Sequence, residues 1–281
     1  MRHRIKAACI QNCATPDVQE NIAVCMRLVQ EAAAAGATLI ALPEYFSGLH
    51  TEGFRIIPVA FPEREHPVLP AFAEAARRLK VSILLGSLGV KAADGRTFNR
   101  SYLLARDGTV VARYDKIHMF DVDLGEGTVV RESATIAPGG EAVVAEAEGI
   151  SLGLSICYDL RFAHLYRALA HDGADVLAVP AAFTRITGQA HWHVLNRARA
   201  IENGAFVLAP CQFGTLAGGA ECYGHSLIID PWGRVLADGG EEEGFIVAEL
   251  DLAEVEAARA RIPSLTHDRP IAIGAHPAAA E

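Results

Sequence analysis

Long hydrophobic runs and an excess of basic residues are both missing from this sequence of 281 residues. No uncharged apolar stretch reaches the ~18 residues that a membrane-spanning helix needs, although the mean hydropathy is +0.20. The 25 Lys and Arg residues are outnumbered by 34 Asp and Glu residues, and the resulting charge of −9 repels phosphate backbones and anionic lipid headgroups. We therefore expect a soluble protein that binds neither nucleic acid nor membranes.

Cysteine is sparse as well. Six cysteines are too few for a disulfide framework in a chain of this length, and no CxxC pair suggests a zinc site. The basic start is followed by an apolar run that ends before Gln11 and is shorter than the ~7 to 15 residues of a signal-peptide core, which favours a cytoplasmic location. G-x-G-x-x-G and Walker A loops are absent too, so the sequence predicts neither a metal nor an organic cofactor.

Apolar strands and helices alternate along the chain. Residues 5–10, 18–35 and 38–43 have the pattern of strand, helix and strand, which predicts a right-handed parallel crossover. The segment GATLIALPEYF at 36–46 is echoed by GADVLAVPAAF at 173–183, and each copy follows a strand and a helix. This repetition predicts an α/β protein with two similar halves, each a sheet covered by helices.

Predicted turns and antiparallel strands lie between the two halves and near the end of the chain. Two Asp-Gly turns, at 94–95 and 107–108, predict antiparallel hairpins between the halves. The second half is expected to contain a helix at 191–203, followed by an antiparallel set of strands at 223–229, 234–237 and 245–250. No linker separates the halves, so we predict one domain over residues 1–281 with a tail from about residue 271.

Predicted strand ends place three side chains where they can take part in catalysis. Cys157 follows an apolar strand and precedes a predicted helix, so backbone N–H groups that favour a thiolate are expected near its sulfur. Glu44 ends the corresponding strand of the first half, among apolar neighbours where a solvated acid is out of place. Lys116 ends a hairpin strand. Each residue also has a simpler interpretation when it is considered alone. Cys157 can be a buried inert thiol, Glu44 the partner of a buried arginine, and Lys116 a surface lysine.

The sequence blocks around these residues resemble the Glu, Lys and Cys motifs of the nitrilase superfamily of carbon-nitrogen hydrolases. The blocks are LPEYF at 42–46, YDKIHMF at 114–120 and ICYDLRF at 156–162. Further similar blocks are RES at 131–133, TGQAHW at 187–192, RARAIE at 197–202 and YGHS at 223–226. The resemblance covers almost the whole chain and is strongest to the Nit amidases, which include deaminated-glutathione amidase and omega-amidase.

This resemblance implies a four-layer αββα sandwich that forms a homodimer or higher homo-oligomer through its helical layer. It implies that Cys157 attacks an amide to form a thioester, with Glu44 as general base. Lys116 and the backbone N–H of Tyr158 would stabilise the oxyanion. Glu132 would hold Lys116 in place and support its charge.

The resemblance also implies an enzyme that hydrolyses linear amides without a cofactor. We expect it to convert the terminal amide of a small carboxylate-bearing substrate, similar to deaminated glutathione, to an acid and ammonia. Omega-amidase activity on alpha-ketoglutaramate or alpha-ketosuccinamate is the alternative, because the loop LAGGAE at 216–221 lacks the basic residues that suit a long anionic tail. Hydrolysis of nitriles or N-carbamoyl groups, or a binding protein with a remnant site, are more distant alternatives.

Other side chains are assigned to the pocket or set aside. Tyr158, Phe183 and Thr187 are expected to line it, while Arg185 either clamps the substrate carboxylate or points into solvent. The pair formed by His191 and His193 lacks the further ligands that a zinc site needs. A Cys-His pair of Cys157 with His191 or His225 is possible chemically, but in the resemblance Glu44 and Lys116 already fill the roles of base and oxyanion donor.

Overall fold

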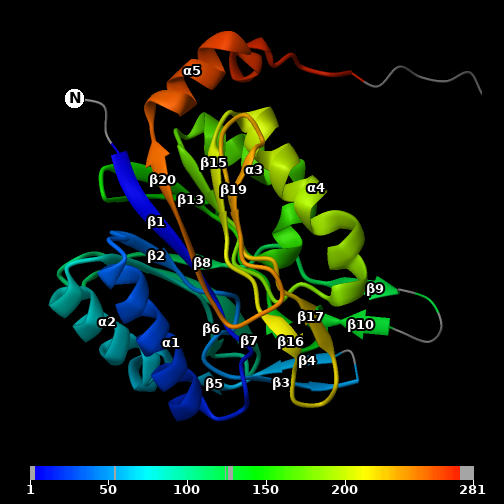
Figure 1. Cartoon of the computed structure of the whole chain (residues 1–281). Helices are drawn as coiled ribbons and strands as arrows, with labels where there is room; N and C mark the ends of the chain where they lie inside the picture. Colours follow the sequence, from blue (N-terminus) through cyan, green and yellow to red (C-terminus); the bar gives the residue numbers. More distant parts are fainter. Residues whose placement is uncertain (1–3, 54, 124, 126–128, 273–281) are drawn as a thin grey trace, which may run out of the picture.

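The computed structural model describes residues 4–53, 55–123, 125 and 129–272. Two sheets lie face to face, and helices cover the outer face of each (Figure 1). The strands of the first sheet are β1 (Arg4–Gln11), β2 (Leu39–Ala41), β5 (Ala60–Phe61), β6 (Ser82–Lys91), β7 (Thr97–Leu104), β8 (Val110–Asp115), β11 (Ile136–Ala137) and β20 (Gly244–Asp251). Their order is β11-β7-β6-β2-β1-β20, with β5 beside β6 and β8 beside β7.

The second sheet repeats this plan with a parallel centre and antiparallel edges. Its strands are β12 (Val143–Ala147), β13 (Ile150–Leu154), β14 (Val176–Ala178), β15 (Phe206–Ala209), β18 (Leu227–Ile229) and β19 (Val235–Asp238). They follow one another in the order β12-β13-β14-β15-β18-β19. The central pairs β13–β14 and β14–β15 are parallel, and β13 and β14 deliver Cys157 and its neighbours to one edge of the sheet.

Four helices complete the sandwich. Three apolar clusters fill it: one between the two sheets, and one between each sheet and its helices. Against the first sheet pack α1 (Val18–Ala34) and α2 (Val68–Leu79), and against the second pack α3 (Ala163–His171) and α4 (Arg185–Asn203) (Figure 1). The α1 helix begins at Asp17, whose carboxylate accepts hydrogen bonds from two backbone N–H groups of the first turn. The four-layer αββα fold expected from the sequence is thus confirmed. None of the helices in the described residues has the length and apolar character for crossing a membrane.

Short hairpins extend from the same end of the sandwich, at the lower right of Figure 1. They are β3 (Leu49–Glu52) with β4 (Arg55–Pro58), β9 (Asp121–Asp123) with β10 (Val129–Arg131), and β16 (Phe213–Thr215) with β17 (Glu221–Tyr223). The remaining elements are the helix α5 (Ala253–Arg261) and the 3₁₀ turns η1 (Glu63–Glu65), η2 (Glu132–Ala134), η3 (Cys157–Arg161) and η4 (Ser264–His267). None of these three hairpins was predicted from the sequence.

Three predicted elements differ from the structure. The strand expected at 223–229 is two strands, β17 and β18, because Gly224 and His225 both have positive φ angles (75° and 53°) and turn the chain between them. The helix expected at 191–203 begins six residues earlier, at Arg185. The last strand, β20, does not join the second antiparallel set but pairs along its whole length with β1 in the first sheet. Most of the predicted tail, from residue 273, lies outside the described residues.

Candidate active site

Cys157 occupies a strained turn at the edge of the second sheet. It is the first residue of η3, just beyond the end of β13, and its φ angle is +49°. This left-handed conformation is costly for any residue with a side chain, and such strain is concentrated at functional sites. A hydrogen bond from its backbone N–H to the carbonyl of Pro180 (2.9 Å) holds the turn against the chain that follows β14. The backbone of Cys157 is therefore fixed at this edge of the sheet, and the residue remains partly exposed.

Glu44 follows β2 and is buried, with about 1% of its surface exposed. One carboxylate oxygen accepts a hydrogen bond from the Asn99 side chain (2.8 Å), and the other accepts one from the backbone N–H of Ala182 (2.8 Å). Ala182 belongs to the second half of the chain, so this acid joins the two halves. A side chain at Gly86 would place a Cβ 1.8 Å from the carbonyl oxygen of Leu42. Glycine at position 86 therefore permits the close approach of the two strand ends below Glu44.

Lys116 lies just beyond β8 and is also buried, with about 2% of its surface exposed. Its Nζ donates to both carboxylate oxygens of Glu132, at 2.9 Å each, and lies 3.3 Å from Glu44 Oε1. Glu132, at the start of η2, accepts a further hydrogen bond from the backbone N–H of Phe120. The ammonium is therefore held between two carboxylates that are fixed independently of it.

The four groups are an ammonium, a thiol and two carboxyl groups, and their burial and proximity shift the pKa values of the lysine and the thiol. Burial alone would lower the pKa of Lys116, but the carboxylates of Glu132 and Glu44 outweigh it and raise that pKa well above its ordinary value. Burial raises the pKa of the Cys157 thiol, and the negative charge of Glu44 raises it further, partly offset by Lys116. Burial also raises the pKa of Glu132. The resting site thus holds a protonated lysine and a neutral thiol, and Glu44 lies near enough to the thiol to raise its pKa.

One buried carboxylate fixes the lysine relative to the cysteine. Asp159 Oδ2 accepts hydrogen bonds from the backbone N–H of Ile156 (2.9 Å) and the hydroxyl of Tyr114 (2.6 Å). Its Oδ1 lies 3.0 Å from the backbone nitrogen and 2.7 Å from Nδ1 of His118. Tyr114 and His118 flank Lys116 on both sides in the chain, while Ile156 precedes Cys157. Asp159 therefore ties both flanks of the lysine to the turn that carries the thiol.

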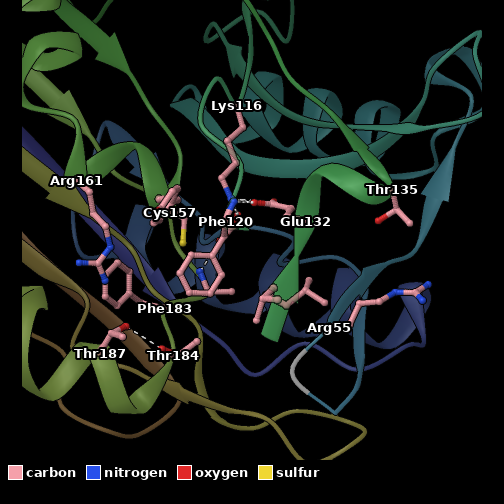
Figure 2. Close-up of a pocket in the computed structure, with 15 residues that line it drawn as sticks. Arg55, Lys116, Phe120, Glu132, Thr135, Cys157, Arg161, Phe183, Thr184 and Thr187 are labelled. Atoms are coloured by element: carbon pink, nitrogen blue, oxygen red, sulfur yellow. Dashed lines mark hydrogen bonds and ion pairs between the residues drawn. The ribbon is translucent and has the colours of Figure 1, made fainter. Parts of the chain in front are cut away.

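A pocket opens in front of these groups (Figure 2). The nitrogen of Lys116 points toward Glu132, and the sulfur of Cys157 faces the same space. Figure 2 also shows Arg161, Phe183 and Thr187 on one side of the pocket and Arg55 on the other. The pocket therefore combines aromatic walls with a guanidinium group at two of its sides.

Seven of the eight residues singled out from the sequence line this pocket: Glu44, Lys116, Glu132, Cys157, Tyr158, Phe183 and Thr187. Arg185 is the exception. It is the first residue of α4, and its guanidinium pairs with the carboxylate of Glu241 (2.9 and 3.2 Å) instead of lining the pocket. The Arg185 guanidinium, which was expected either to clamp a substrate or to point into solvent, thus forms an ion pair with Glu241.

Arg161 and Arg55 line the pocket although the sequence analysis did not select them. The Arg161 guanidinium lies over the rings of Tyr158 (5.8 Å) and Phe183 (5.4 Å), and its Nη1 is 3.3 Å from Nδ1 of His191. Within the described residues, no carboxylate forms an ion pair with Arg161, whereas Arg55 lies 3.8 Å from Glu52. The sequence signal that could have identified Arg161 is its position four residues after Cys157, close enough for its side chain to reach the same pocket.

The pocket contains the parts needed for nucleophilic attack on a carbonyl carbon: a thiol, a buried carboxylate in the same pocket, and a fixed ammonium group. In the described part of the chain, one group of side chains has the spacing of metal ligands, namely His193, His225 and Asp238. None of these three lines the pocket.

Comparisons with known proteins identify the family of the chain. The carbon-nitrogen hydrolase family model matches residues 6–260. A deaminated glutathione amidase from Synechocystis is 41% identical over 266 residues, which cover 93% of this chain and 97% of that protein. A human omega-amidase is 32% identical over 250 residues, or 89% and 90% of the two chains. A crystal structure from Saccharomyces cerevisiae, described as branch 10 of the nitrilase superfamily, superimposes with a TM-score of 0.81, 28% identity and coverage of 93% and 95%.

Proposed function

Because the chain belongs to the carbon-nitrogen hydrolase family and is an amidase by its close similarity to amidases, we propose that it hydrolyses the amide bond of a small substrate bearing a carboxylate. The observation that supports this proposal is the convergence of Cys157, Glu44, Lys116 and Glu132, which come from distant parts of the chain, on one pocket. Cys157 is the nucleophile, Glu44 the general base, and Lys116 the group that stabilises the oxyanion.

The first half of the reaction forms a thioester. As the sulfur of Cys157 bonds to the amide carbon, its proton passes to Glu44, which lines the same pocket. The carbonyl oxygen becomes an oxyanion stabilised by Lys116 and the backbone N–H of Tyr158. The carbon–nitrogen bond then breaks, and the proton held by Glu44 passes to the departing nitrogen. Because the thiol is neutral at rest, transfer to Glu44 and attack belong to the same step.

The second half releases the acid. Glu44 takes a proton from a water molecule, whose oxygen attacks the thioester carbon. The carbon–sulfur bond breaks, and the proton returns to the sulfur of Cys157. Glu132 is a positioning residue in both halves, since its two oxygens hold Lys116 Nζ at 2.9 Å and oppose the tendency of burial to remove the lysine proton.

The side chain of Arg161 is the reason that we expect the substrate to carry a carboxylate. Its guanidinium faces the pocket and lacks a carboxylate partner among the described residues, while Tyr158 and Phe183 fix its plane. A guanidinium in this state binds a carboxylate through two parallel hydrogen bonds. The acidic end of the substrate therefore lies at Arg161, and the amide lies between Cys157 and Lys116.

Deaminated glutathione is the substrate type we favour, because the Synechocystis amidase named for it is 41% identical to this chain and the human omega-amidase 32%. Deaminated glutathione is an amide of cysteinylglycine, so its leaving group is an amine and not the ammonia that we expected from the sequence, whereas a keto-acid amide such as alpha-ketoglutaramate does release ammonia. The loop that joins β16 to β17 favours the second candidate. It packs on Thr51 through the carbonyl of Ala217 and offers no basic side chain to a long anionic tail.

The test is a substrate panel in which both the released amine and ammonia are measured. The panel contains deaminated glutathione, alpha-ketoglutaramate, a neutral amide of similar size, a nitrile and an N-carbamoyl amino acid. We expect kcat/KM to be highest for deaminated glutathione and lowest for the nitrile and N-carbamoyl compounds. Turnover confined to alpha-ketoglutaramate would reassign the substrate, and no amide turnover at all would reject the proposal.

We also propose that the enzyme is a homodimer joined through α4. Large apolar side chains are exposed on and beside this helix: Val194 (66% exposed), Ile201 (52%) and Trp232 (55%). Sedimentation velocity is expected to give twice the chain mass, and Ile201→Glu is expected to shift the protein toward the monomer. The control Val111→Glu replaces a residue of similar exposure on β8. A monomeric parent protein would contradict the proposal.

We place the enzyme in the cytoplasm. All six cysteines are free thiols, including the two that lie close to the surface, Cys13 and Cys157. Thiols are kept reduced in the cytosol, whereas disulfides form in oxidising compartments. Cell fractionation is expected to recover the amidase activity with cytoplasmic markers, and its recovery with secreted or periplasmic proteins would contradict this placement.

A further inference from the structure

A second cluster of polar side chains lies outside the pocket, on the outer side of the second sheet. His193 projects from α4, His225 stands in the turn between β17 and β18, and Asp238 ends β19. In the sequence, His193 has no pattern of further metal ligands near it beyond His191. The fold supplies them from later in the chain, Asp238 being 45 residues from His193.

The three side chains have the spacing of a metal site. His193 Nε2 lies 3.0 Å from Asp238 Oδ2, and His225 Nδ1 lies 2.9 Å from Asp238 Oδ1. One ligand atom from each of the three residues lies within 4.8 Å of the other two. An ion bound at the usual ~2.0–2.2 Å from nitrogen and oxygen ligands fits among atoms at these separations. The side chains are 23 to 35% exposed, so an ion and its water ligands can reach them.

A carboxylate lies near each ring nitrogen of His225, although the one at Nε2 is beyond hydrogen-bond distance. Its Nδ1 faces Asp238, while its other ring nitrogen, Nε2, faces Glu241 Oε1 at 3.9 Å. Metal-bound histidines almost always direct the second ring N–H to a carboxylate, a carbonyl or water, which fixes the tautomer. Glu241 is itself held by both terminal nitrogens of Arg185. The ion pair that withdraws Arg185 from the substrate pocket therefore orients a carboxylate behind His225.

The remaining contacts make the cluster rigid. The ring of Tyr223 stacks on His225 with the ring centres 4.5 Å apart, and the indole N–H of Trp192 donates to the carbonyl of His225 (2.7 Å). The backbone N–H of Gly240 donates to Asp238 Oδ1 (2.9 Å). A rigid set of ligands loses little conformational freedom when an ion binds, and this favours affinity.

We propose that His193, His225 and Asp238 form a binding site for one divalent transition-metal ion, with water completing the coordination. Two imidazole nitrogens and one carboxylate oxygen suit Zn²⁺, Ni²⁺ and Co²⁺, whereas Mg²⁺ and Ca²⁺ prefer oxygen ligands alone. His193 binds through Nε2 with its proton on Nδ1. His225 binds through Nδ1 with its proton on Nε2, toward Glu241. The two hydrogen bonds to Asp238 are replaced by bonds to the metal.

The experiment measures Zn²⁺ and Co²⁺ binding to the full-length enzyme by titration calorimetry and absorption spectroscopy. A Cys157→Ser background removes the active-site thiol, which would otherwise bind these ions. We expect one ion per chain, and a Co²⁺ spectrum without the near-ultraviolet band of a thiolate ligand. His193→Ala should weaken binding at least ~10-fold, since even the loss of an outer-shell partner costs 10–100-fold in affinity.

Two further variants complete the test. Asp238→Asn removes the charged ligand while keeping its shape, and is expected to weaken binding as His193→Ala does. His267→Ala is the matched control, because this exposed histidine lies outside the cluster, and should leave the affinity unchanged. Thermal melts of each variant without metal show whether the fold is retained. Equal affinity in the parent and His193→Ala proteins, a thiolate band, or no binding at all would each overturn the proposal.

Discussion

Replacing Arg161 with glutamine tests how the enzyme selects an acidic substrate. The guanidinium of Arg161 lies on two aromatic rings at the side of the pocket, and no intramolecular carboxylate pairs with it in the described structure. Hydrogen bonds to a charged group contribute about 1.5–3 kcal/mol, so Arg161→Gln should lower kcat/KM for a carboxylate-bearing amide by roughly 10- to 150-fold. A neutral amide of the same length makes no such contact, and its kcat/KM should change less than about threefold.

The assay compares the two substrates in the parent enzyme, Arg161→Gln and the control Arg185→Gln. Arg185 is satisfied by Glu241 and lies outside the pocket, so its replacement should not alter the ratio of the two kcat/KM values. The loss in Arg161→Gln should appear mainly as a higher KM, because the carboxylate is bound equally in the ground state and the transition state. An equal loss for the charged and neutral substrates would refute the reasoning, since it would indicate a distorted site rather than a lost contact.

Three other predictions follow from the buried charges. Lys116→Met should reduce kcat by about 100- to 1000-fold and destabilise the fold by ~3–5 kcal/mol, because Glu44 and Glu132 lose their shared cation; denaturant melts with stability equal to the parent would contradict this. Asp159→Asn should lower kcat by about 100-fold with little change in KM, because it loosens Lys116 relative to Cys157; an unchanged kcat would reject the positioning role. Burial lowers the pKa of His66 to about 4, so the unfolded chain binds more protons between pH 6.5 and 4 and stability falls as pH falls through that range, by about 3 kcal/mol. The variant His66→Gln should lack this part of the pH dependence of unfolding, and an identical dependence in both proteins would exclude His66 as its source.

The catalytic candidates were accessible from the sequence because they occupy strand ends. The carboxyl ends of the parallel strands β2 and β13 bring Glu44 and Cys157 to one edge of the sandwich. A buried carboxylate or ammonium also stands out in an apolar stretch, since it must be paired when it folds. The sequence pattern around these residues is therefore enough to identify them, because both the strand ends and the isolated charges are visible in it.

The residues that recognise the substrate had no comparable local signal. Arg161 and Arg185 both follow apolar segments, and only the three-dimensional contacts distinguish them: Glu241 neutralises Arg185, while two aromatic rings hold Arg161 at the pocket. The position of β20 was equally hidden. Its sequence suits either sheet, and the choice of β1 as its partner depends on long-range pairing from Arg4 to Asp251. The cluster of His193, His225 and Asp238 also depends on such pairing.

The central claim is that the reaction passes through a thioester on Cys157, and rapid acid quench followed by mass spectrometry tests it most directly. The parent enzyme, mixed with substrate in excess, should gain the mass of the acyl group on the peptide that contains Cys157. Cys157→Ala should fold normally, carry no adduct and release neither amine nor ammonia. Substrate turnover by Cys157→Ala, or an adduct on any other residue, would contradict the account.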